Sequence, residues 1–282
     1  MWGHKDWKGQ FFTSDIKPSE QLNQYSQFYT TVEGNTTFYA LPSEEKVQHW
    51  SEQVPSDFKF CFKVPKTISH EMILNQAQSI EAMQAFLTLL KPIIDTNKLG
   101  QLMLQLPASF SARRLGELND FIQQFAKQVQ LSVEVRHPDF FAKQDAERDF
   151  NRMLINTQVN RVLMDTRAVH SQAPTTEAII DAQKKKPKVP VHAIATSASP
   201  IIRYVGQTDL NANIAFIQPW IKKVRDWVAE GRTPYLFIHT ADNASIHQLS
   251  RLWLSLLQQD QEHTLFYDNG FASEKVQQTS LF

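Results

Sequence analysis

The chain has 282 residues, of which 42% are hydrophobic and 21% are charged, a composition that is ordinary for a soluble globular protein. Its 29 Lys and Arg residues are balanced by 29 Asp and Glu residues, so it lacks the net positive charge that accompanies general nucleic-acid binding. The sequence contains no stretch near the roughly 18 apolar residues that a membrane-crossing helix requires.

The cysteine content and the amino terminus bear on the cellular compartment. Cys61 is the only cysteine of the chain and cannot form an internal disulfide, which fits a reducing environment. The first residues, Met1 to Asp6, lack the apolar region of a signal peptide. We therefore expect a cytoplasmic protein.

Seven short apolar runs recur along the chain, and each ends in a polar or charged side chain. The runs cover residues 32–35, 58–63, 102–105, 131–136, 162–165, 201–203 and 235–239. Strands that are covered on both faces read as near-continuous apolar stretches, as they do in parallel sheets flanked by helices. Polar residues at the carboxyl ends of such strands form the active sites of α/β barrel enzymes. The pattern predicts that these polar side chains gather at one end of the barrel.

Between these runs lie segments whose apolar residues recur at intervals of three and four. Three of them, residues 83–94, 115–129 and 214–228, are predicted to be helices that pack on a sheet through one apolar stripe. A turn is expected over residues 97–100. The alternation of strand and helix predicts βαβ units and a parallel sheet. Seven such strands favour a closed ring, so we expect an α/β, TIM-like barrel in a single domain over residues 1–282.

One segment departs from this rhythm. Residues 168–200 form a long excursion, since a strand-to-helix loop usually has about 2–6 residues. A short helix is predicted over residues 175–186, and its end overlaps a lysine-rich run at residues 184–188. Long excursions are often lids or binding loops, whereas a lysine run is more often a solvated surface.

Several runs of residues resemble the YecE-like family, a widespread bacterial family of unknown function. They are residues 31–39, 64–70 and 133–141, with further matches at residues 105–110 and 181–192. The resemblance covers essentially the whole chain. It implies a TIM-barrel-like fold, and it supplies no reaction.

The amino terminus departs from the pattern of that family. Members of the family usually begin with a short apolar strand before the equivalent of residues 2–7, whereas this chain starts inside that motif. Either the start codon was assigned late, or the first strand of the barrel is missing or truncated. Such a gap would leave an edge with unpaired backbone groups.

Alternation along each strand decides which side chains point toward the barrel axis, because residues two apart share a face. The inward pairs are predicted to be Glu33 with Asn35, Cys61 with Lys63, Met103 with Gln105, Glu134 with Arg136, Leu163 with Asp165, Ile201 with Arg203, and Phe237 with His239. This choice places the phenylalanines of residues 58–62 under the helices. It leaves no unpaired charge in the helical layer, where burial of an ion would be costly. It predicts apolar lower layers and a polar top layer.

The top layer and the loops beside it supply the candidate site residues. We expect catalytic roles for Glu33, Glu134, Asp165 and His239. We expect substrate-binding roles for Asn35, Lys63, His70, Gln105, Arg136, His137 and Arg203. The alternative is that these charges form a structural network of buried ion pairs that fixes the strand register.

Three chemistries suit these residue types. Carboxylates and histidine can bind a divalent metal, but the interleaved cations would repel it, so we expect no metal and no cofactor. Glu33 and Glu134 could form a glycosidase pair, at separations of roughly 5 Å or 6.5–9.5 Å, beside aromatic residues that stack on a sugar. The cations could instead clamp a phosphate or carboxylate, with Glu134 or His239 as the base and Asp165 orienting a partner.

The sequence therefore predicts an enzyme that acts on a small polar or anionic substrate by hydrolase-type or lyase-type acid–base chemistry. The expected partner is a small-molecule substrate rather than nucleic acid or a membrane. The alternative is a non-catalytic barrel that binds a ligand or nucleic acid through the lysine-rich loop.

Overall fold

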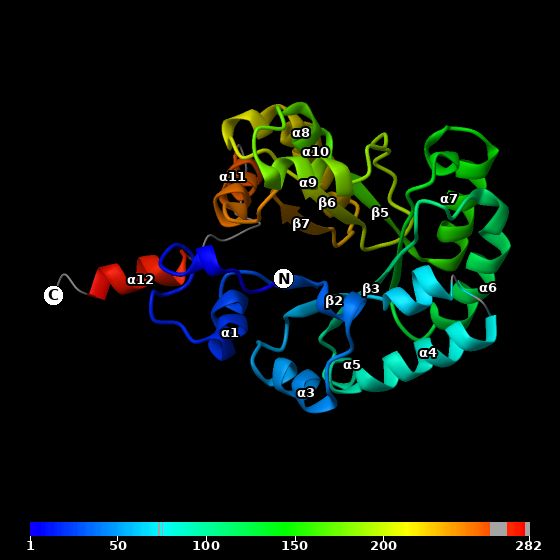
Figure 1. Ribbon diagram of the computed structural model, residues 1–282, viewed down its shortest axis with the longest axis horizontal. Coiled ribbons are helices and arrows are strands. Elements are labelled where there is room, and N and C mark those ends of the chain that lie inside the picture. Colours follow the sequence, from blue (N-terminus) through cyan, green and yellow to red (C-terminus); the bar gives the residue numbers. More distant parts are fainter. Residues whose placement is uncertain (73, 75, 260–269, 280–282) are drawn as a thin grey trace. The chain divides into compact units, whose positions relative to one another are not determined.

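The computed structural model describes residues 1–72, 74, 76–259 and 270–279 (Figure 1). Within them lie seven strands: β1 (Thr31–Gly34), β2 (Lys59–Lys63), β3 (Leu99–Gln105), β4 (Leu131–Glu134), β5 (Asn160–Asp165), β6 (Ile201–Val205) and β7 (Tyr235–His239). The strands follow one another in chain order in the sheet, and those from β1 to β5 pair in parallel. All seven predicted strands are present, each followed by a helix, and the fold is of the α/β TIM-like type. No strand precedes β1 in the described chain.

The chain forms two compact units, which we describe separately. The first contains residues 1, 30–163 and 189–201, and the second contains residues 2–29, 164–188 and the described part of 202–282. The helices of the first unit are α2 (Thr36–Tyr39), α3 (Glu44–Glu52), α4 (Gln76–Leu89), α5 (Lys91–Asp95), α6 (Leu115–Phe125) and α7 (Asp145–Thr157). Those of the second are α1 (Gln21–Ser26), α8 (Arg167–Ser171), α9 (Glu177–Lys185), α10 (Ile214–Ala229), α11 (Ile246–Gln258) and α12 (Ala272–Thr279). The single domain stays a prediction.

Helices α6, α9 and α10 confirm the predicted helices, and their apolar stripes are buried. The helix predicted over residues 83–94 is instead two helices, α4 and α5. Pro92 lies in the first turn of α5, where its missing N–H costs least, and it cannot continue α4. The turn predicted over residues 97–100 is shorter than expected. Asn97 makes it with a φ of 55°, and β3 begins at Leu99.

None of the helices in the described part of the chain combines the length and the apolar character that a bilayer crossing requires.

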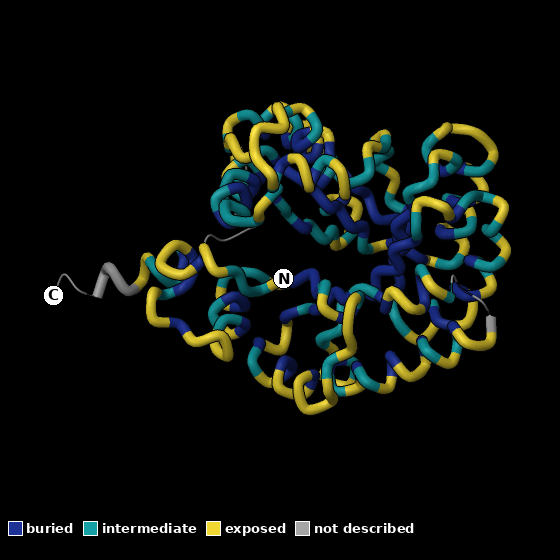
Figure 2. The backbone as a smooth tube through the Cα atoms, viewed as in Figure 1, coloured by how far each residue is buried: buried dark blue, intermediate teal, exposed yellow. Residues whose placement is uncertain are grey.

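The strands of the first unit have one face under the helices. The buried rings of Phe60 and Phe62 on β2 stack with their centroids 5.4 Å apart, and the Phe62 ring lies 5.9 Å from that of Trp50 on α3. Figure 2 shows these strands buried, while the helices that cover them alternate between buried and exposed residues. The prediction that the phenylalanines of β2 face the helices is confirmed. On the opposite, inner face, Cys61 contacts Thr31 of β1.

The lower part of that inner face is polar, so the prediction of apolar lower layers is wrong. Gln101, Ser132 and Asn160 are all completely buried. The Asn160 amide donates to Gln101 Oε1 at 2.7 Å, and the Gln101 amide donates to the carbonyl oxygen of Ser199 at 2.7 Å. Burial of these amides is tolerated because they hydrogen-bond one another and the segment at residues 189–200.

Strand β5 presents the opposite face from the one that the sequence predicts. The Arg161 guanidinium donates to Glu147 Oε1 at 2.9 Å and Asn151 Oδ1 at 2.8 Å, both on α7. Because side chains alternate along a strand, Leu163 and Asp165 share the helix-facing side of Arg161. Their predicted inward orientation is wrong. Arg161 faces the helices because its counter-charge, Glu147, lies on α7.

His192 joins the same ion pair and fastens the segment at residues 189–201 to α7. Its Nδ1 lies 2.5 Å from Glu147 Oε1, while the Lys143 amide donates to Glu147 Oε2 at 2.8 Å. Burial alone would raise the pKa of Glu147, but hydrogen bonds from His192, Lys143 and Arg161 lower it below its usual value. We call Arg161, Glu147 and His192 the latch.

Replacing Glu147 by Gln tests the latch. Glu147→Gln leaves the Arg161 charge buried without its counter-charge, so we expect a loss of about 3–5 kcal/mol in the free energy of unfolding, measured by urea denaturation. Changing both Glu147 and Arg161 to Met should cost less stability, because no unpaired charge then stays buried. The exposed pair Lys91–Asp95 is the control, and Asp95→Asn should cost under about 1 kcal/mol. Equal losses in the two single variants would contradict a structural role for the latch.

In the second unit, His247 of α11 is buried in an aromatic cluster. Its ring stacks on Phe11 with the centroids 3.7 Å apart and the planes 8° apart, and its Nδ1 lies 2.8 Å from the Tyr29 hydroxyl. Trp7 approaches edge-on with its centroid 4.3 Å away. Burial lowers the pKa of His247 to about 3, so the imidazole is neutral at pH 7.

This burial predicts how stability depends on pH. Between pH 6.5 and about 3, His247 is protonated in the unfolded chain but neutral in the folded protein. Lowering the pH through this range therefore favours unfolding. We expect His247→Phe to reduce the loss of stability between pH 7 and pH 4 by on the order of a few kcal/mol, as measured by urea denaturation at each pH. His49→Gln, on the surface of α3, is the control. A pH dependence like that of the unaltered protein in His247→Phe would refute the prediction.

Candidate functional site

Polar side chains meet at the carboxyl ends of β1 to β4 in the first unit. The parallel register places Gln105, the last residue of β3, opposite Glu134, the last residue of β4. On the neighbouring strands, Glu33 lies near the end of β1, and Lys63 ends β2. We call the following residues the rim cluster: Glu33, Lys63, His70, Gln105, Glu134 and Arg136.

Lys63 links three strands of the rim cluster. Its ammonium group lies 3.9 Å from Glu33 Oε1 and donates to Gln105 Oε1 at 3.0 Å. It also lies 5.7 Å from the centroid of the Phe38 ring, which gives a cation–π contact. The Lys63 side chain is only 12% exposed, so these contacts replace most of its hydration.

Glu134 and Arg136 form the second charged pair of the cluster. Arg136 donates through Nε at 2.8 Å and through one terminal nitrogen at 2.7 Å, and both bonds go to Glu134 Oε1. The Glu134 side chain is 3% exposed and that of Arg136 is 21% exposed. The carboxylate is therefore buried, while the guanidinium reaches the surface.

His70 stands beside these charges on a π-helical turn (Thr67–Glu71) that follows β2. Its Nδ1 lies 2.9 Å from the Ser69 hydroxyl, and its ring centroid is 5.3 Å from that of Phe38. Burial lowers the pKa of His70, and the positive charges of Arg136 and Lys66 lower it further. His70 is thus a neutral imidazole at pH 7 that is able to accept a proton.

Two other predicted binding residues lie on loops of the same unit. Asn35 follows β1, and its side-chain oxygen is buried without a hydrogen-bond partner among the residues that the structure describes. His137 follows β4 and caps a short 3₁₀ helix (Pro138–Phe141), accepting a hydrogen bond from the Asp139 amide at 3.3 Å. Part of the hydrogen-bonding capacity of His137 is therefore used locally.

Asp165, Arg203 and His239 belong to the second unit, so the rim cluster does not include them. Asp165 is completely buried and accepts hydrogen bonds from Arg167 through both carboxylate oxygens, at 3.0 and 2.8 Å. The Trp220 indole on α10 donates to the same carboxylate at 2.8 Å. These contacts give Asp165 a structural task, namely to join the start of α8 to α10.

Arg203 is buried on β6, on the face opposite Tyr204. The Tyr204 ring contacts that of Trp253 on α11, with the centroids 5.4 Å apart, so Arg203 points away from α11. His239 ends β7 and is half-buried. The catalytic and binding roles of these three predicted residues stay predictions.

Other chemistries have less support in the described residues. Burial raises the pKa of the Cys61 thiol to about 12, so this cysteine is not an activated nucleophile. Within the part of the chain that the structure describes, no three His, Cys, Asp or Glu side chains gather closely enough to hold a metal ion.

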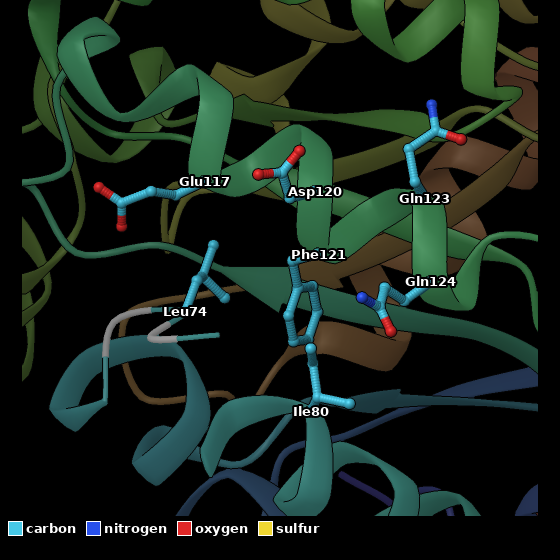
Figure 3. Close-up of a pocket in the computed structure, with 7 residues that line it drawn as sticks. All are labelled: Leu74, Ile80, Glu117, Asp120, Phe121, Gln123 and Gln124. Atoms are coloured by element: carbon cyan, nitrogen blue, oxygen red, sulfur yellow. The ribbon is translucent and has the colours of Figure 1, made fainter. Parts of the chain in front are cut away.

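A surface hollow of about 520 Å³ lies in the helical layer of the first unit. Figure 3 shows its lining, with Ile80 of α4 facing Phe121 of α6, and with acidic and amide side chains of α6 around them. No residue of the rim cluster lines it. The hollow lacks cations, nucleophiles and histidines among its lining residues, so we do not assign the chemistry to it.

The family model described as "Protein of unknown function DUF72" matches residues 1–273. The chain belongs to the DUF72 family. The DUF72 chain is 42% identical over 283 residues to the UPF0759 protein YecE of Escherichia coli K12, an alignment that covers 100% of this chain and 97% of the relative. The UPF0759 protein YunF of Bacillus subtilis 168 is 26% identical over 115 residues, which are 40% of each chain.

Solved structures of DUF72 proteins have the same fold. One from Thermotoga maritima MSB8 superposes with a TM-score of 0.71 at 20% identity, covering 92% of this chain and 97% of the other. One from Enterococcus faecalis V583 superposes with a TM-score of 0.68 at 21% identity, covering 85% of this chain and 94% of the other. The predicted resemblance and fold are confirmed.

The different exposure of two arginines predicts that two Glu→Gln variants differ in stability. Glu134→Gln removes the partner of Arg136, whose side chain is 21% exposed and can be hydrated, so we expect a loss of only about 1 kcal/mol. Glu147→Gln is the matched comparison, because the Arg161 side chain is 2% exposed and cannot reach water. Urea denaturation of both variants measures the difference. A loss in Glu134→Gln as large as that in Glu147→Gln would show that the rim cluster is primarily structural.

Proposed function

We propose that this DUF72 protein is an enzyme that binds a small anionic substrate at the rim cluster and acts on it by hydrolase-type or lyase-type acid–base chemistry. One observation carries the proposal: two buried carboxylates, two cations and a neutral histidine, from neighbouring strands and the segments that follow them, gather within one unit. Active sites of TIM-like enzymes lie at this end of the strands. Acid–base catalysis requires one group that donates a proton and one that accepts a proton, both positioned beside the substrate.

The hydrogen bonds of Arg136 support ligand binding over a purely structural network. Arg136 uses two of its nitrogens on a single oxygen of Glu134, and its third nitrogen has no partner in the described residues. A guanidinium that only neutralised Glu134 would gain most from bonding both carboxylate oxygens. The observed arrangement keeps one donor directed away from the carboxylate.

Each group has a definite task in this proposal. Lys63 and Arg136 hold the anionic group of the substrate, the first as a point charge and the second through its planar fork. Glu134 and His70 transfer protons, since His70 is neutral at pH 7 and Glu134 is sheltered from water. Glu33 is the second carboxylate and holds Lys63 in place. Asp165 has no task in this proposal, because it lies in the second unit, where Arg167 and Trp220 occupy its carboxylate.

The alternative function is nucleic-acid binding through the lysine-rich segment, and it has less support. Lys185 pairs with Asp181 on α9 at 2.8 Å, which offsets part of the positive charge of that helix. The cytoplasmic location stays a prediction.

Binding of simple anions tests the proposal. We expect inorganic phosphate, sulfate or a small carboxylate to raise the Tm of the protein in a concentration-dependent manner, because a ligand that binds the folded state stabilises it by mass action. Arg136→Met should weaken this binding by about 10-fold to 100-fold, the range of a lost charge-assisted hydrogen bond. Lys127→Met, an exposed lysine just after α6, is the matched control and should bind like the unaltered protein.

Two outcomes would contradict the proposed function. One is the absence of any Tm increase across the anion panel, with and without added divalent metal. The other is an equal loss of binding in Arg136→Met and Lys127→Met, which would indicate unspecific attraction by surface charge.

A further inference from the structure

Hydrogen-bonding groups beside the rim cluster that the protein itself does not use bear on the chemical class of the substrate. The first is the side-chain oxygen of Asn35, which is buried and has no partner within the described chain. An oxygen that is removed from water without a hydrogen bond is destabilising, so such atoms in folded proteins call for an explanation. Carbonyl oxygens only accept hydrogen bonds. A ligand that satisfied Asn35 would have to donate one.

The position of Asn35 connects it to the rim cluster. Asn35 comes directly after β1, two residues beyond Glu33, and it precedes α2. Its backbone oxygen accepts a hydrogen bond from the Phe38 amide at 3.2 Å, and the Phe38 ring contacts both Lys63 and His70. Phe38 therefore links the segment that carries Asn35 to Lys63 and His70 of the rim cluster.

The second unused group is the amide nitrogen of Gln105. The ammonium group of Lys63 can only donate, so the contact at 3.0 Å fixes the Gln105 oxygen toward Lys63 and directs the NH₂ group away from it. The residue is 7% exposed, and the hydrogen bond from Lys63 is the one that its side chain makes within the described part of the chain. Together with the third nitrogen of Arg136, it offers hydrogen-bond donors suited to an anion.

The third feature is an exposed aromatic ring next to these groups. Tyr39 is 80% exposed, and its ring meets that of Phe38 edge-on, with the centroids 5.1 Å apart. The face of such a ring can pack against the apolar face of a sugar, while its hydroxyl stays hydrated.

We infer that the substrate is a small polyhydroxylated anion, of the class of sugar phosphates and sugar acids. Its anionic group contacts the donors of Arg136 and Gln105 beside Lys63, and a hydroxyl group next to the anion donates to Asn35. Tyr39 covers the carbon face of the ligand. This inference rests on the proposed function, because it assigns a substrate class to the same site.

Isothermal titration of the full chain with matched probes tests this inference. The probes are glucose 6-phosphate, gluconate, inorganic phosphate, acetate and glucose. We expect at least one hydroxylated anion to bind about tenfold or more tightly than the bare anion with the same charged group, and glucose to bind weakest. The phosphate and carboxylate arms distinguish the two sources of the anionic group.

The variant Asn35→Ala separates the hydroxyl contact from the anion contact. It should weaken the binding of the preferred hydroxylated anion by about 3-fold to 10-fold, as expected for one lost neutral hydrogen bond, and leave the affinity for the bare anion unchanged. Asn119→Ala on α6 is the matched control and should change neither affinity. Because the Asn35 oxygen has no partner, its removal should not lower the Tm of the unliganded protein, which verifies that the variant folds.

The outcomes distinguish this inference from the proposed function. If bare and hydroxylated anions bind equally well, or if Asn35→Ala weakens both alike, the substrate class is wrong while anion binding stands. If none of the anions binds, the proposed function fails and the inference fails with it.

Discussion

The ammonium group of Lys63 is the constraint on which the carboxyl ends of the first strands depend. A positive charge that is largely withdrawn from water must be surrounded by acceptors, and Glu33 and Gln105 provide them from the strands on either side. The parallel register then places Gln105 opposite Glu134, so Arg136 is drawn to the same end. Lys63 on β2 thus contacts residues of β1 and β3 directly, and the pairing of β3 with β4 adds Glu134 and Arg136.

The first unit contains two arginine–glutamate pairs whose surroundings give them different tasks. Arg161 is buried on every side, and Glu147, Asn151 and a backbone oxygen use its nitrogens. Arg136 bonds a single oxygen of Glu134 and reaches the surface. The first pair fills its hydrogen bonds within the protein and is suited to holding elements together. The second keeps a donor in reserve and is suited to recognition.

Much of the architecture could be predicted from the sequence because hydrophobic periodicity is a local signal. The seven strands, α6 and α10 follow directly from it, as does the inner face of β1 to β4. Local signals fail where a distant partner decides the outcome. Arg161 turns β5 toward Glu147, and Gln101 is stabilised on the inner face by the segment that carries Ser199. Neither partner can be deduced from the strands themselves.

The candidate site divides in the same way. Alternation correctly groups Lys63 with Gln105, and Glu134 with Arg136, since each pair depends on strand geometry. The same rule misplaces Asp165, because the indole of Trp220 lies 55 residues further along the chain. Alternation also selects Asn35 as a candidate, but that its side-chain oxygen is unpaired could not be predicted, since this depends on what the folded chain leaves unsatisfied.

The order of the chain through the two units has a practical consequence for anyone who wishes to dissect this protein. Residues 189–201 return to the first unit after the chain has entered the second, and they carry both His192 and Ser199. A fragment that stops after β5 would lack them, leaving Glu147 and Gln101 with unmet hydrogen bonds in its interior. Neither half of the molecule corresponds to one uninterrupted stretch of the gene, so deletion mapping would report misfolding rather than the location of an activity.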